Sequence, residues 1–260
     1  AISLASSVDE DVRRRDFTIN GMVYDNDSGQ VFDFVGGMED LQNGVVKFIG
    51  DPEKRIREDS VRMLRAIRFA NRFDFTIDPE SLKAIKKNMP KIKDIPGERI
   101  RLEMMKMLEA KDTINGLNLM LETGFFEHVM PELYAGHGVD QNRYHGESIL
   151  LHNMLAADAI KKKDPVLKMA MLLHDVAKVK TKTYNEETQD YNFLGHETVG
   201  AKMAEKILKR LKFSAEEITR ITSIIEHHMY YFTDESKDKT IKKFMNLPEF
   251  RSILRARLAD

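Results

Sequence analysis

The amino-acid pattern changes at Asp51, and this change restricts the chain to a small β part followed by a much larger helical part. Before Asp51, apolar runs at residues 17–24 and 31–35 are separated by turn-forming residues and are typical of short strands. From Asp51 the apolar residues recur at helical spacing, with Asp51 suited to an N-cap and Pro52 to the first helical position. The sequence therefore predicts an α+β chain whose strands are confined to residues 1–50.

The helical part divides at a polar stretch around residues 136–138, where we expect a domain boundary. Helices are predicted at residues 51–72, 78–87, 97–110, 114–123, 148–160, 165–178, 197–211 and 215–230, with a last one toward Asp260. The chain is thus expected to comprise a β part at 1–50, a mostly helical neck at 51–138 and an all-helical domain at 139–260. Two or three short strands do not form a stable sheet alone, so the β part should need strands that precede Ala1, or a partner chain.

Composition excludes several classes of protein. The 260 residues include no cysteine, which excludes disulfides, thiolate zinc sites and cysteine nucleophiles and fits a reducing compartment. No apolar run approaches the roughly 20 residues that cross a bilayer. Residues 1–8 lack the basic start and apolar core of a secretory signal, so a cytoplasmic protein without membrane contact is expected.

Charge is unevenly distributed, although 41 Lys+Arg nearly balance 42 Asp+Glu. Residues 51–110 hold 15 basic and 11 acidic side chains, and residues 151–260 hold 20 and 16. Residues 1–50 hold 4 basic and 9 acidic side chains, and residues 111–150 hold 2 and 6. Part of the surface could therefore bind a polyanion even though the formal net charge is −1.

One helical segment carries a stripe of arginines beside a carboxylate. At about 100° per residue, its polar members fall within half a turn of one another and its apolar members gather on the opposite side. The polar members are Asp59, Arg62, Arg65 and Arg68, and the apolar ones are Val61, Leu64 and Ile67. A fixed Asp–Arg pair can match the edge of a nucleic-acid base, and neighbouring guanidinium groups can hold phosphates. The alternative is a solvated helix with ion pairs between side chains three residues apart.

A second arginine-rich motif stands directly before the first predicted strand. Taken alone, Arg13–Arg15 could be a charged strand edge that discourages aggregation. Taken together, RRDFTIN at 14–20 and EDSVRMLRAIRF at 58–69 resemble the bacterial tRNA nucleotidyltransferase (CCA-adding enzyme) and poly(A) polymerase family. DFVGG at 33–37 and FIGDP at 48–52 also match that family, and runs this long in the right order are more specific than a short motif.

The resemblance implies a partial nucleotidyltransferase head, a neck with nucleotide-selecting and RNA-binding helices, and nucleotide addition to an RNA 3′ end. Arg15 would contact the ribose or triphosphate of the incoming nucleotide, and Asp59 with Arg62 would pair with the base of CTP or ATP. Arg65 and Arg68 would complete the nucleotide pocket. The expected enzyme builds or repairs the CCA end of tRNA with Mg²⁺, while the neck and C-terminal helices bind the tRNA acceptor arm.

The chain departs from the family in a feature that bears on catalysis. The family's Mg²⁺-binding carboxylates, in a DxD arrangement, precede the RRDFTIN motif, and only fourteen residues precede Arg15 here. Asp9, Glu10 and Asp11 are assigned to a linker and not to a metal site. No catalytic residue for nucleotidyl transfer is therefore expected in this chain. We expect a truncated enzyme or one piece of a split enzyme, completed by a separate head segment or by a homo-oligomer.

Histidines and carboxylates mark a second candidate site within residues 139–260. His174–Asp175 end a strongly apolar predicted helix, where charged groups are rarely buried without a partner. Two histidines and two carboxylates from separate helices suit a divalent cation such as Mg²⁺, Mn²⁺, Ni²⁺ or Fe²⁺. The pattern resembles the H…HD…D core of HD phosphohydrolase domains, which implies metal ligands at His152, His174, Asp175 and Asp260. The resemblance also implies accessory ligands or phosphate contacts at His196 and at one of His227 and His228.

Other functions stay open on the sequence alone. The chain could be a metal-dependent phosphohydrolase that acts through the HD residues on phosphorylated or cyclic-phosphate nucleotides. It could also be a noncatalytic module that binds tRNA or nucleotides. The HD helices could retain their histidines without holding a metal, because the partners that orient metal ligands cannot be identified from the sequence.

Overall fold

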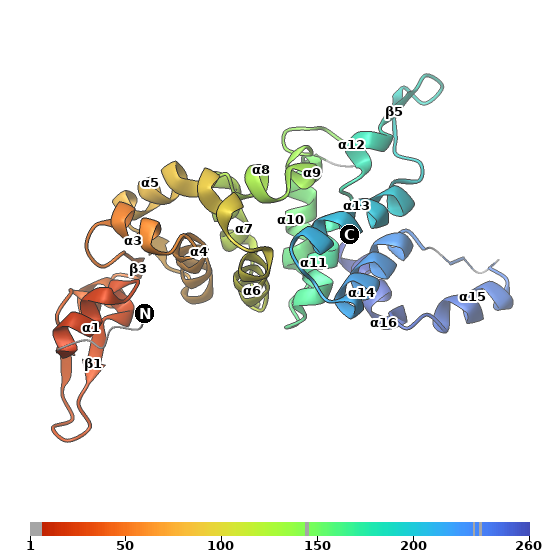
Figure 1. Cartoon of the computed structure of the whole chain (residues 1–260). Coiled ribbons are helices and arrows are strands. Elements are labelled where there is room, and N and C mark those ends of the chain that lie inside the picture. Colours follow the sequence, from red (N-terminus) through yellow and green to blue (C-terminus); the bar gives the residue numbers. More distant parts are fainter. Residues whose placement is uncertain (1–6, 144–145, 231, 234–235) are drawn as a thin grey trace. The chain divides into compact units, whose positions relative to one another are not determined.

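The structure, a computed structural model, describes residues 7–143, 146–230, 232–233 and 236–260. It comprises two compact units, Ala1–Met107 with Asn115–Val129, and Leu108–Ile114 with Met130–Asp260. Helices dominate both units and the sheets are small, which confirms the predicted α+β class (Figure 1). Within the residues given above, none of the helices combines the length and the apolar character that crossing a bilayer demands.

The first unit begins with short elements around small sheets. They are α1 (Val8–Arg14), η1 (Thr18–Asn20, a 3₁₀ turn), β1 (Met22–Tyr24), β2 (Val31–Asp33), α2 (Gly37–Gln42) and β3 (Val45–Val46). β1 and β2 are antiparallel, whereas β3 pairs in parallel with β4 (Thr76–Ile77). The buried ring of Phe17 packs on Phe48 and Phe69, which anchors this region to the helix that contains Phe69.

Two predictions for this region are wrong. Residues 9–11, predicted as a linker, belong to α1, because Ser7 caps the helix and each acidic side chain pairs with the arginine four residues later. The predicted strand at 17–24 is interrupted by η1. Its cause is the Asp16 carboxylate, which accepts hydrogen bonds from the Phe17 N–H and the Asn20 amide and so closes a local turn.

From Pro52 to Val129 the regular elements are helices, joined by short connections, apart from β4. They are α3 (Pro52–Glu58), α4 (Arg62–Phe73), α5 (Pro79–Asn88), η2 (Met89–Asp94), α6 (Gly97–Leu108), α7 (Ile114–Glu122) and α8 (Phe125–Val129). The prediction of one helix over 51–72 is wrong. The backbone is extended at Asp59, with φ −154° and ψ 104°, so α3 ends at Glu58. The Asp59 carboxylate accepts a hydrogen bond from the Val61 N–H, and α4 then begins at Arg62.

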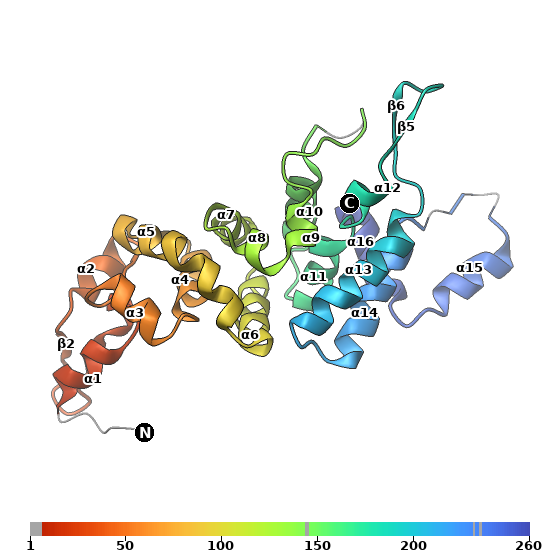
Figure 2. The same ribbon diagram turned by 45° about the horizontal axis from the view of Figure 1, so that its top comes forward.

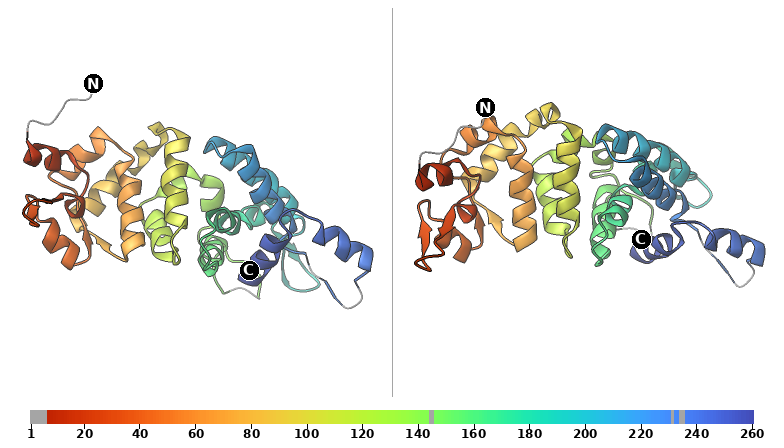
Figure 3. Two further views of the ribbon diagram at one scale, coloured as in Figure 1. Left: turned by 90° about the horizontal axis from the view of Figure 1, so that it is seen from below. Right: turned by 60° about the horizontal axis from the view of Figure 1, so that its bottom comes forward.

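The second unit is helical, as predicted, with one added hairpin. Its helices are α9 (Pro131–Tyr134), α10 (Ile149–Ala159), α11 (Pro165–Leu173), α12 (Lys178–Thr181), α13 (His196–Arg210), α14 (Ala215–His227), α15 (Asp238–Met245) and α16 (Phe250–Ala259). α11 is buried from Leu167 to Leu173, so the residues that follow it start inside the unit. α13 and α14 pack side by side (Figure 3). The hairpin of β5 (Thr183–Asn185) and β6 (Asp190–Asn192) lies between α12 and α13 (Figure 2) and was not predicted.

Candidate functional sites

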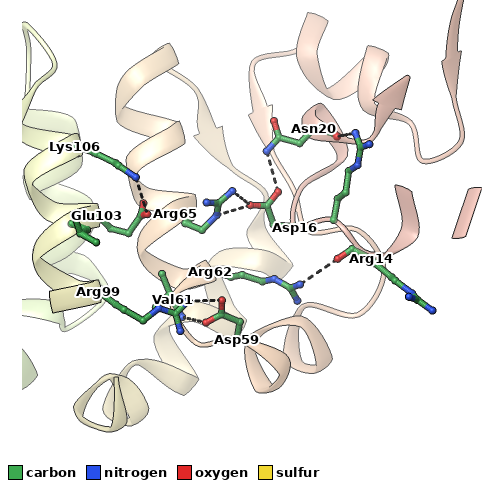
Figure 4. Close-up of a pocket in the computed structure, with 12 residues that line it drawn as sticks. Arg14, Asp16, Asn20, Asp59, Val61, Arg62, Arg65, Arg99, Glu103 and Lys106 are labelled. Atoms are coloured by element: carbon green, nitrogen blue, oxygen red, sulfur yellow. Dashed lines mark hydrogen bonds and ion pairs between the residues drawn. The ribbon is translucent and has the colours of Figure 1, made fainter. Parts of the chain in front are cut away.

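A pocket of about 550 Å³ in the first unit gathers charged side chains from three segments (Figure 4). The chain from the end of α1 to η1 contributes Arg14, Arg15, Asp16 and Asn20. The break before α4, with α4 itself, contributes Asp59, Val61, Arg62 and Arg65, and α6 contributes Arg99, Leu102, Glu103 and Lys106. The structure thus brings together four of the side chains singled out in the sequence, namely Arg15, Asp59, Arg62 and Arg65.

Asp59 and Arg62 both line this pocket but have different partners. Asp59 Oδ2 accepts a hydrogen bond from Arg99 Nη2 at 2.8 Å, whereas Arg62 Nη1 donates to Glu58 at 2.7 Å. The hydrogen bond from Arg62, supported by Arg55, holds the pKa of Glu58 below its usual value. The two side chains thus have different partners, because the helix break lets Asp59 reach Arg99 on α6. Their role in reading a base stays a prediction.

The RRDFTIN segment is fixed to α4 by a partly buried ion pair. Arg65 Nε donates to Asp16 Oδ2 at 2.7 Å, and the Asp16 side chain is 9% exposed. Arg15 pairs with Asp11 at 2.8 Å and donates to the Asn20 carbonyl at 3.0 Å. Asp16 was given no role from the sequence, although it stands inside the motif. Its two carboxylate oxygens connect the η1 turn and α4, so it positions the arginines around the pocket.

Arg68 lies behind the pocket and not in its lining. Its guanidinium is buried, 2.7 Å from the Glu103 carboxylate and 4.3 Å from the centre of the Phe69 ring. Glu103 does line the pocket, so Arg68 supports the wall that α6 forms. Sequence reasoning missed this wall. Arg99, Leu102 and Lys106 stand three and four residues apart on a predicted helix, but nothing in that spacing showed which segment the helix would face.

In the second unit, the residues proposed from sequence as metal ligands converge. His152 comes from α10, His174 and Asp175 follow α11, and Asp260 follows α16. His152 Nε2 lies 3.2 Å from His174 Nε2 and 3.0 Å from Asp260 Oδ1. His174 Nε2 lies 3.2 Å from Asp175 Oδ2. One ligand atom from each of the four residues lies within 4.8 Å of the others, close enough to share one metal ion.

Asp175 also belongs to a second group through its other oxygen. Asp175 Oδ1 lies 3.2 Å from His196 Nε2 and 3.7 Å from His228 Nε2. The two imidazole nitrogens are 3.3 Å apart. His227 joins neither group, because its Nδ1 lies 2.8 Å from the Ser223 carbonyl, on its own helix. Of the three accessory histidines named from the sequence, the structure brings His196 and His228 to Asp175.

The backbone orients three of these histidines. Each Nδ1 lies 2.6–2.7 Å from the carbonyl oxygen three residues earlier, in His174, His196 and His228. In a neutral imidazole, an N–H donated there leaves a lone pair on Nε2, which points into the cluster. Among the described residues, neither oxygen of the buried Asp175 carboxylate accepts a hydrogen bond of good geometry. Lys178 Nζ nevertheless lies 2.5 Å from Asp175 Oδ2. Converging lone pairs and carboxylate oxygens fit a bound cation.

The pKa values of the cluster show that its buried carboxylates are stabilised by positive charge. Burial lowers the pKa of His174, but the carboxylates of Asp175 and Asp260 outweigh burial and raise this pKa to about 10. Burial, followed by the charge of His174, lowers the pKa of His228 to about 4. Burial alone would raise the pKa of Asp175, yet His174, His196 and Lys178 hold it well below its usual value. A divalent cation would supply the positive charge that these groups require.

Three family models match the chain in succession. The poly A polymerase head domain matches residues 2–47, the probable RNA and SrmB-binding site of polymerase A matches 74–135, and the HD domain matches 144–258. The chain is thus similar, in sequence order, to a polymerase head domain, to a probable RNA-binding site and to an HD domain. These matches confirm the resemblance of its motifs to the tRNA nucleotidyltransferase and poly(A) polymerase family.

Individual relatives support this assignment. The A-adding tRNA nucleotidyltransferase of Deinococcus radiodurans is 29% identical over 269 residues, which cover 98% of this chain and 61% of that protein. The CCA-adding enzyme of Limosilactobacillus reuteri is 42% identical over 127 residues, 49% of this chain and 31% of that enzyme. The crystal structure of the Bacillus stearothermophilus CCA-adding enzyme in complex with CTP shares the fold, with a TM-score of 0.63 and 22% identity over 99% of this chain and 56% of that chain. The chain spans 61% of the length of the first relative and less of the other two.

Proposed function

We propose that the chain selects the nucleotide and binds the RNA in an enzyme that adds nucleotides to the 3′ end of tRNA. The observation that carries this proposal is the pocket in which Arg15, Asp59, Arg62 and Arg65 meet. Similarity to CCA-adding enzymes supports CTP and ATP as the nucleotides and tRNA as the partner, in building or repairing the CCA end. Residues 1–50 would be the C-terminal part of the head, 51–138 the neck and 139–260 the HD domain of a cytoplasmic enzyme.

Each side chain of the pocket has a distinct task in this proposal. The Asp59 carboxylate accepts a hydrogen bond from the amino group of the base, and the Arg62 guanidinium donates to the neighbouring ring nitrogen. On their Watson–Crick edges, cytosine and adenine both offer that donor and acceptor side by side, whereas uracil and guanine do not. Arg15 and Arg65 hold the ribose and the phosphates, and Arg68 completes the pocket by supporting Glu103.

The metal chemistry of nucleotidyl transfer is assigned to residues outside this chain. When bound, Mg²⁺ would activate the RNA 3′-hydroxyl and neutralise charge on the triphosphate. Its carboxylate ligands would come from a separate head segment or from another copy in a homo-oligomer. The residues described here would bind the nucleotide, orient its base and hold the RNA.

Nucleotide binding to the purified chain tests base selection. We expect calorimetric titration to show CTP and ATP binding about tenfold or more tighter than UTP and GTP, because a mismatched edge leaves donors or acceptors unpaired. Arg62→Ala should remove most of this preference. Arg72→Ala, on the same helix but outside the pocket lining, is the matched control. An unchanged preference in Arg62→Ala would contradict the assigned role.

Incorporation into RNA tests the division between this chain and a head segment. We expect the chain alone to leave tRNA that lacks its terminal CCA unextended in the presence of labelled CTP, ATP and Mg²⁺. Addition of a DxD-containing head segment should restore incorporation. Incorporation by the chain alone would overturn our assignment of the metal ligands.

We also propose a second activity, because the buried Asp175 carboxylate joins two groups of metal ligands. In this proposal the HD domain is a phosphohydrolase that acts on phosphorylated or cyclic-phosphate nucleotides. His152, His174, Asp175 and Asp260 would hold one divalent ion, Mg²⁺, Mn²⁺, Ni²⁺ or Fe²⁺. His196 and His228 would be accessory ligands.

Elemental analysis combined with a phosphatase assay tests the HD site. We expect the wild type to contain a divalent metal and to hydrolyse a nucleotide phosphate, and His174→Ala to lose both properties. His227→Ala should retain both, because His227 belongs to neither ligand group. Metal content and hydrolysis unchanged by His174→Ala would remove the proposed site.

A further inference from the structure

His152 is oriented differently from the other three histidines of the metal-ligand cluster. Their Nδ1 atoms lie against backbone carbonyls, whereas the Nδ1 of His152 lies 3.3 Å from the Glu147 carboxylate. On the other side of the same ring, Nε2 lies 3.0 Å from Asp260 Oδ1. A proton on Nδ1 that is donated to Glu147 leaves the Nε2 lone pair directed at the other ligands. Glu147 is therefore placed to set both the orientation and the tautomer of His152.

The backbone that carries Glu147 is held by contacts with both of its neighbours in the fold. The next residue, Ser148, caps α10 by accepting a hydrogen bond from the Leu151 N–H and forms an antiparallel bridge with Asp140. The buried Gln141 side chain donates through Nε2 to the Glu147 carbonyl at 3.4 Å. The Glu147 carboxylate thus stands on a chain segment that is fixed relative to α10.

Gln141 also connects this segment to a second proposed metal ligand. Its Oε1 accepts a hydrogen bond from Lys178 Nζ at 2.7 Å. Lys178 Nζ in turn lies 2.5 Å from Asp175 Oδ2, and all three side chains are buried. The connection that precedes α10 is therefore linked to two of the ligands, to one through Glu147 and to the other through Gln141.

The chemistry of the pair suits the orientation of a metal ligand. The His152 side chain is 7% exposed and that of Glu147 is 30% exposed, so an enclosed ring meets a carboxylate at the edge of the unit. Metal-bound imidazoles commonly donate their second N–H to a carboxylate or a carbonyl, which fixes the ring and makes the ligand more basic. A carboxylate does this more strongly than a neutral carbonyl, because its hydrogen bond is charge-assisted.

We propose that Glu147 is a positioning residue of the HD site, which holds His152 with Nε2 toward the bound metal. The inference rests on the HD metal site proposed above and deepens it by naming the group that orients one of the ligands. Glu147 acts through His152 and does not bind the metal itself. Its acceptor oxygen is therefore the feature that matters, and a glutamine in its place should preserve most of the effect.

Calorimetric titration of the metal-free chain with Mn²⁺ tests this role. We expect Glu147→Ala to weaken Mn²⁺ binding about tenfold or more, as loss of a partner that orients a ligand commonly does. Glu147→Gln should stay within severalfold of the wild type, because the amide oxygen can still accept the Nδ1–H of His152. Metal-free Glu147→Ala should melt within a few degrees of the wild type in scanning calorimetry.

Glu197→Ala is the matched control for the loss of one negative charge near the cluster. The Glu197 side chain is 31% exposed, and its Oε2 lies 3.5 Å from His196 Nδ1. That nitrogen already lies 2.7 Å from the Phe193 carbonyl, so the ring keeps its orientation without the carboxylate. Glu197→Ala should therefore weaken Mn²⁺ binding severalfold at most.

The outcomes for Glu147 and for the HD site can be told apart. Absence of Mn²⁺ binding by the wild type, or binding that His174→Ala leaves unchanged, would refute the HD metal site and with it the role of Glu147. Where His174→Ala abolishes binding, an affinity unchanged in Glu147→Ala, or lowered equally in Glu147→Gln or Glu197→Ala, would overturn the role of Glu147 alone. A much lower melting temperature of metal-free Glu147→Ala would make Glu147 a structural residue and would also overturn that role.

Discussion

The buried Arg68–Glu103 pair gives the sharpest test of how the nucleotide pocket is built. The two side chains are 10% and 8% exposed, and their charged atoms lie 2.7 Å apart. The motif resemblance assigned Arg68 to nucleotide binding, whereas the structure makes it the support of the α6 wall. Glu103→Ala removes the carboxylate and leaves a guanidinium in the interior without its counter-charge, next to the Phe69 ring at 4.3 Å.

The size of the effect follows from the cost of an uncompensated buried charge. Breaking a buried ion pair from one side costs about 3–5 kcal/mol. The Phe69 ring retains a cation–π interaction with Arg68 that is worth about 1 kcal/mol, so we expect the lower end of this range. The double variant Arg68→Met/Glu103→Leu replaces both charges by apolar side chains of similar size. It should therefore lie within about 1 kcal/mol of the wild type.

Hydrogen exchange followed by mass spectrometry reports the effect locally, in peptides from α4 and α6. A loss of about 3 kcal/mol corresponds to exchange roughly a hundredfold faster, because each 1.4 kcal/mol is a factor of about ten. Glu103→Ala should show this acceleration in both helices, and the double variant should restore slow exchange. Exchange unchanged in Glu103→Ala, or equally fast in the double variant, would refute the proposed support. Loss of CTP binding in a well-protected double variant would return Arg68 to direct nucleotide contact.

Three further predictions concern other parts of the chain. Burial raises the pKa of Asp158, but Lys161 and the N–H groups of Thr113 and Ile114 outweigh it, so its net pKa is lowered. Asp158→Ala should cost about 1–2 kcal/mol at pH 7. The free energy of unfolding of the variant and of the wild type should become more similar below about pH 4, because the Asp158 carboxylate of the wild type is then protonated. A difference that does not change with pH would contradict this prediction. Chelation with EDTA should lower the melting temperature of metal-loaded wild type and of His227→Ala but not that of His174→Ala, measured by scanning calorimetry. Gly37→Ala would place a methyl group 2.1 Å from the Thr18 carbonyl oxygen and should lower the melting temperature by several degrees, whereas Gly146→Ala, with no heavy atom within 4 Å, should not.

Periodicity and capping in the sequence were sufficient to predict most helices. α5, α10 and α11 begin where an aspartate or serine can cap them, and α5 and α11 carry proline in the first turn. The burial of His174 and Asp175 could be predicted as well, because both directly follow a strongly apolar helix. A polar pair in that position must face the interior, where it needs a partner.

The missed features depend on contacts between segments far apart in the sequence. The break at Asp59 cannot be read from helical spacing, because the side chain that stabilises it, Arg99, lies on another helix. The same holds for the α6 wall, whose position is fixed by the Arg68–Glu103 pair. The β5–β6 hairpin was missed because its strands have three residues each and are largely exposed. Such strands carry little apolar alternation to recognise.

The charge of the proposed nucleotide pocket would allow a chain of net charge −1 to attract a triphosphate. Its lining includes six cationic side chains and three acidic ones, so the local surplus is positive although the whole chain is nearly neutral. The acidic side chains already pair with cations, as Asp59 does with Arg99 and Asp16 with Arg65. A base can bind Asp59 beside Arg99, because an ionised carboxylate accepts more hydrogen bonds than the two that Val61 and Arg99 donate. A base whose edge cannot donate to Asp59 and accept from Arg62 would lose these hydrogen bonds and would bind more weakly, which is how the proposed pocket would select its base.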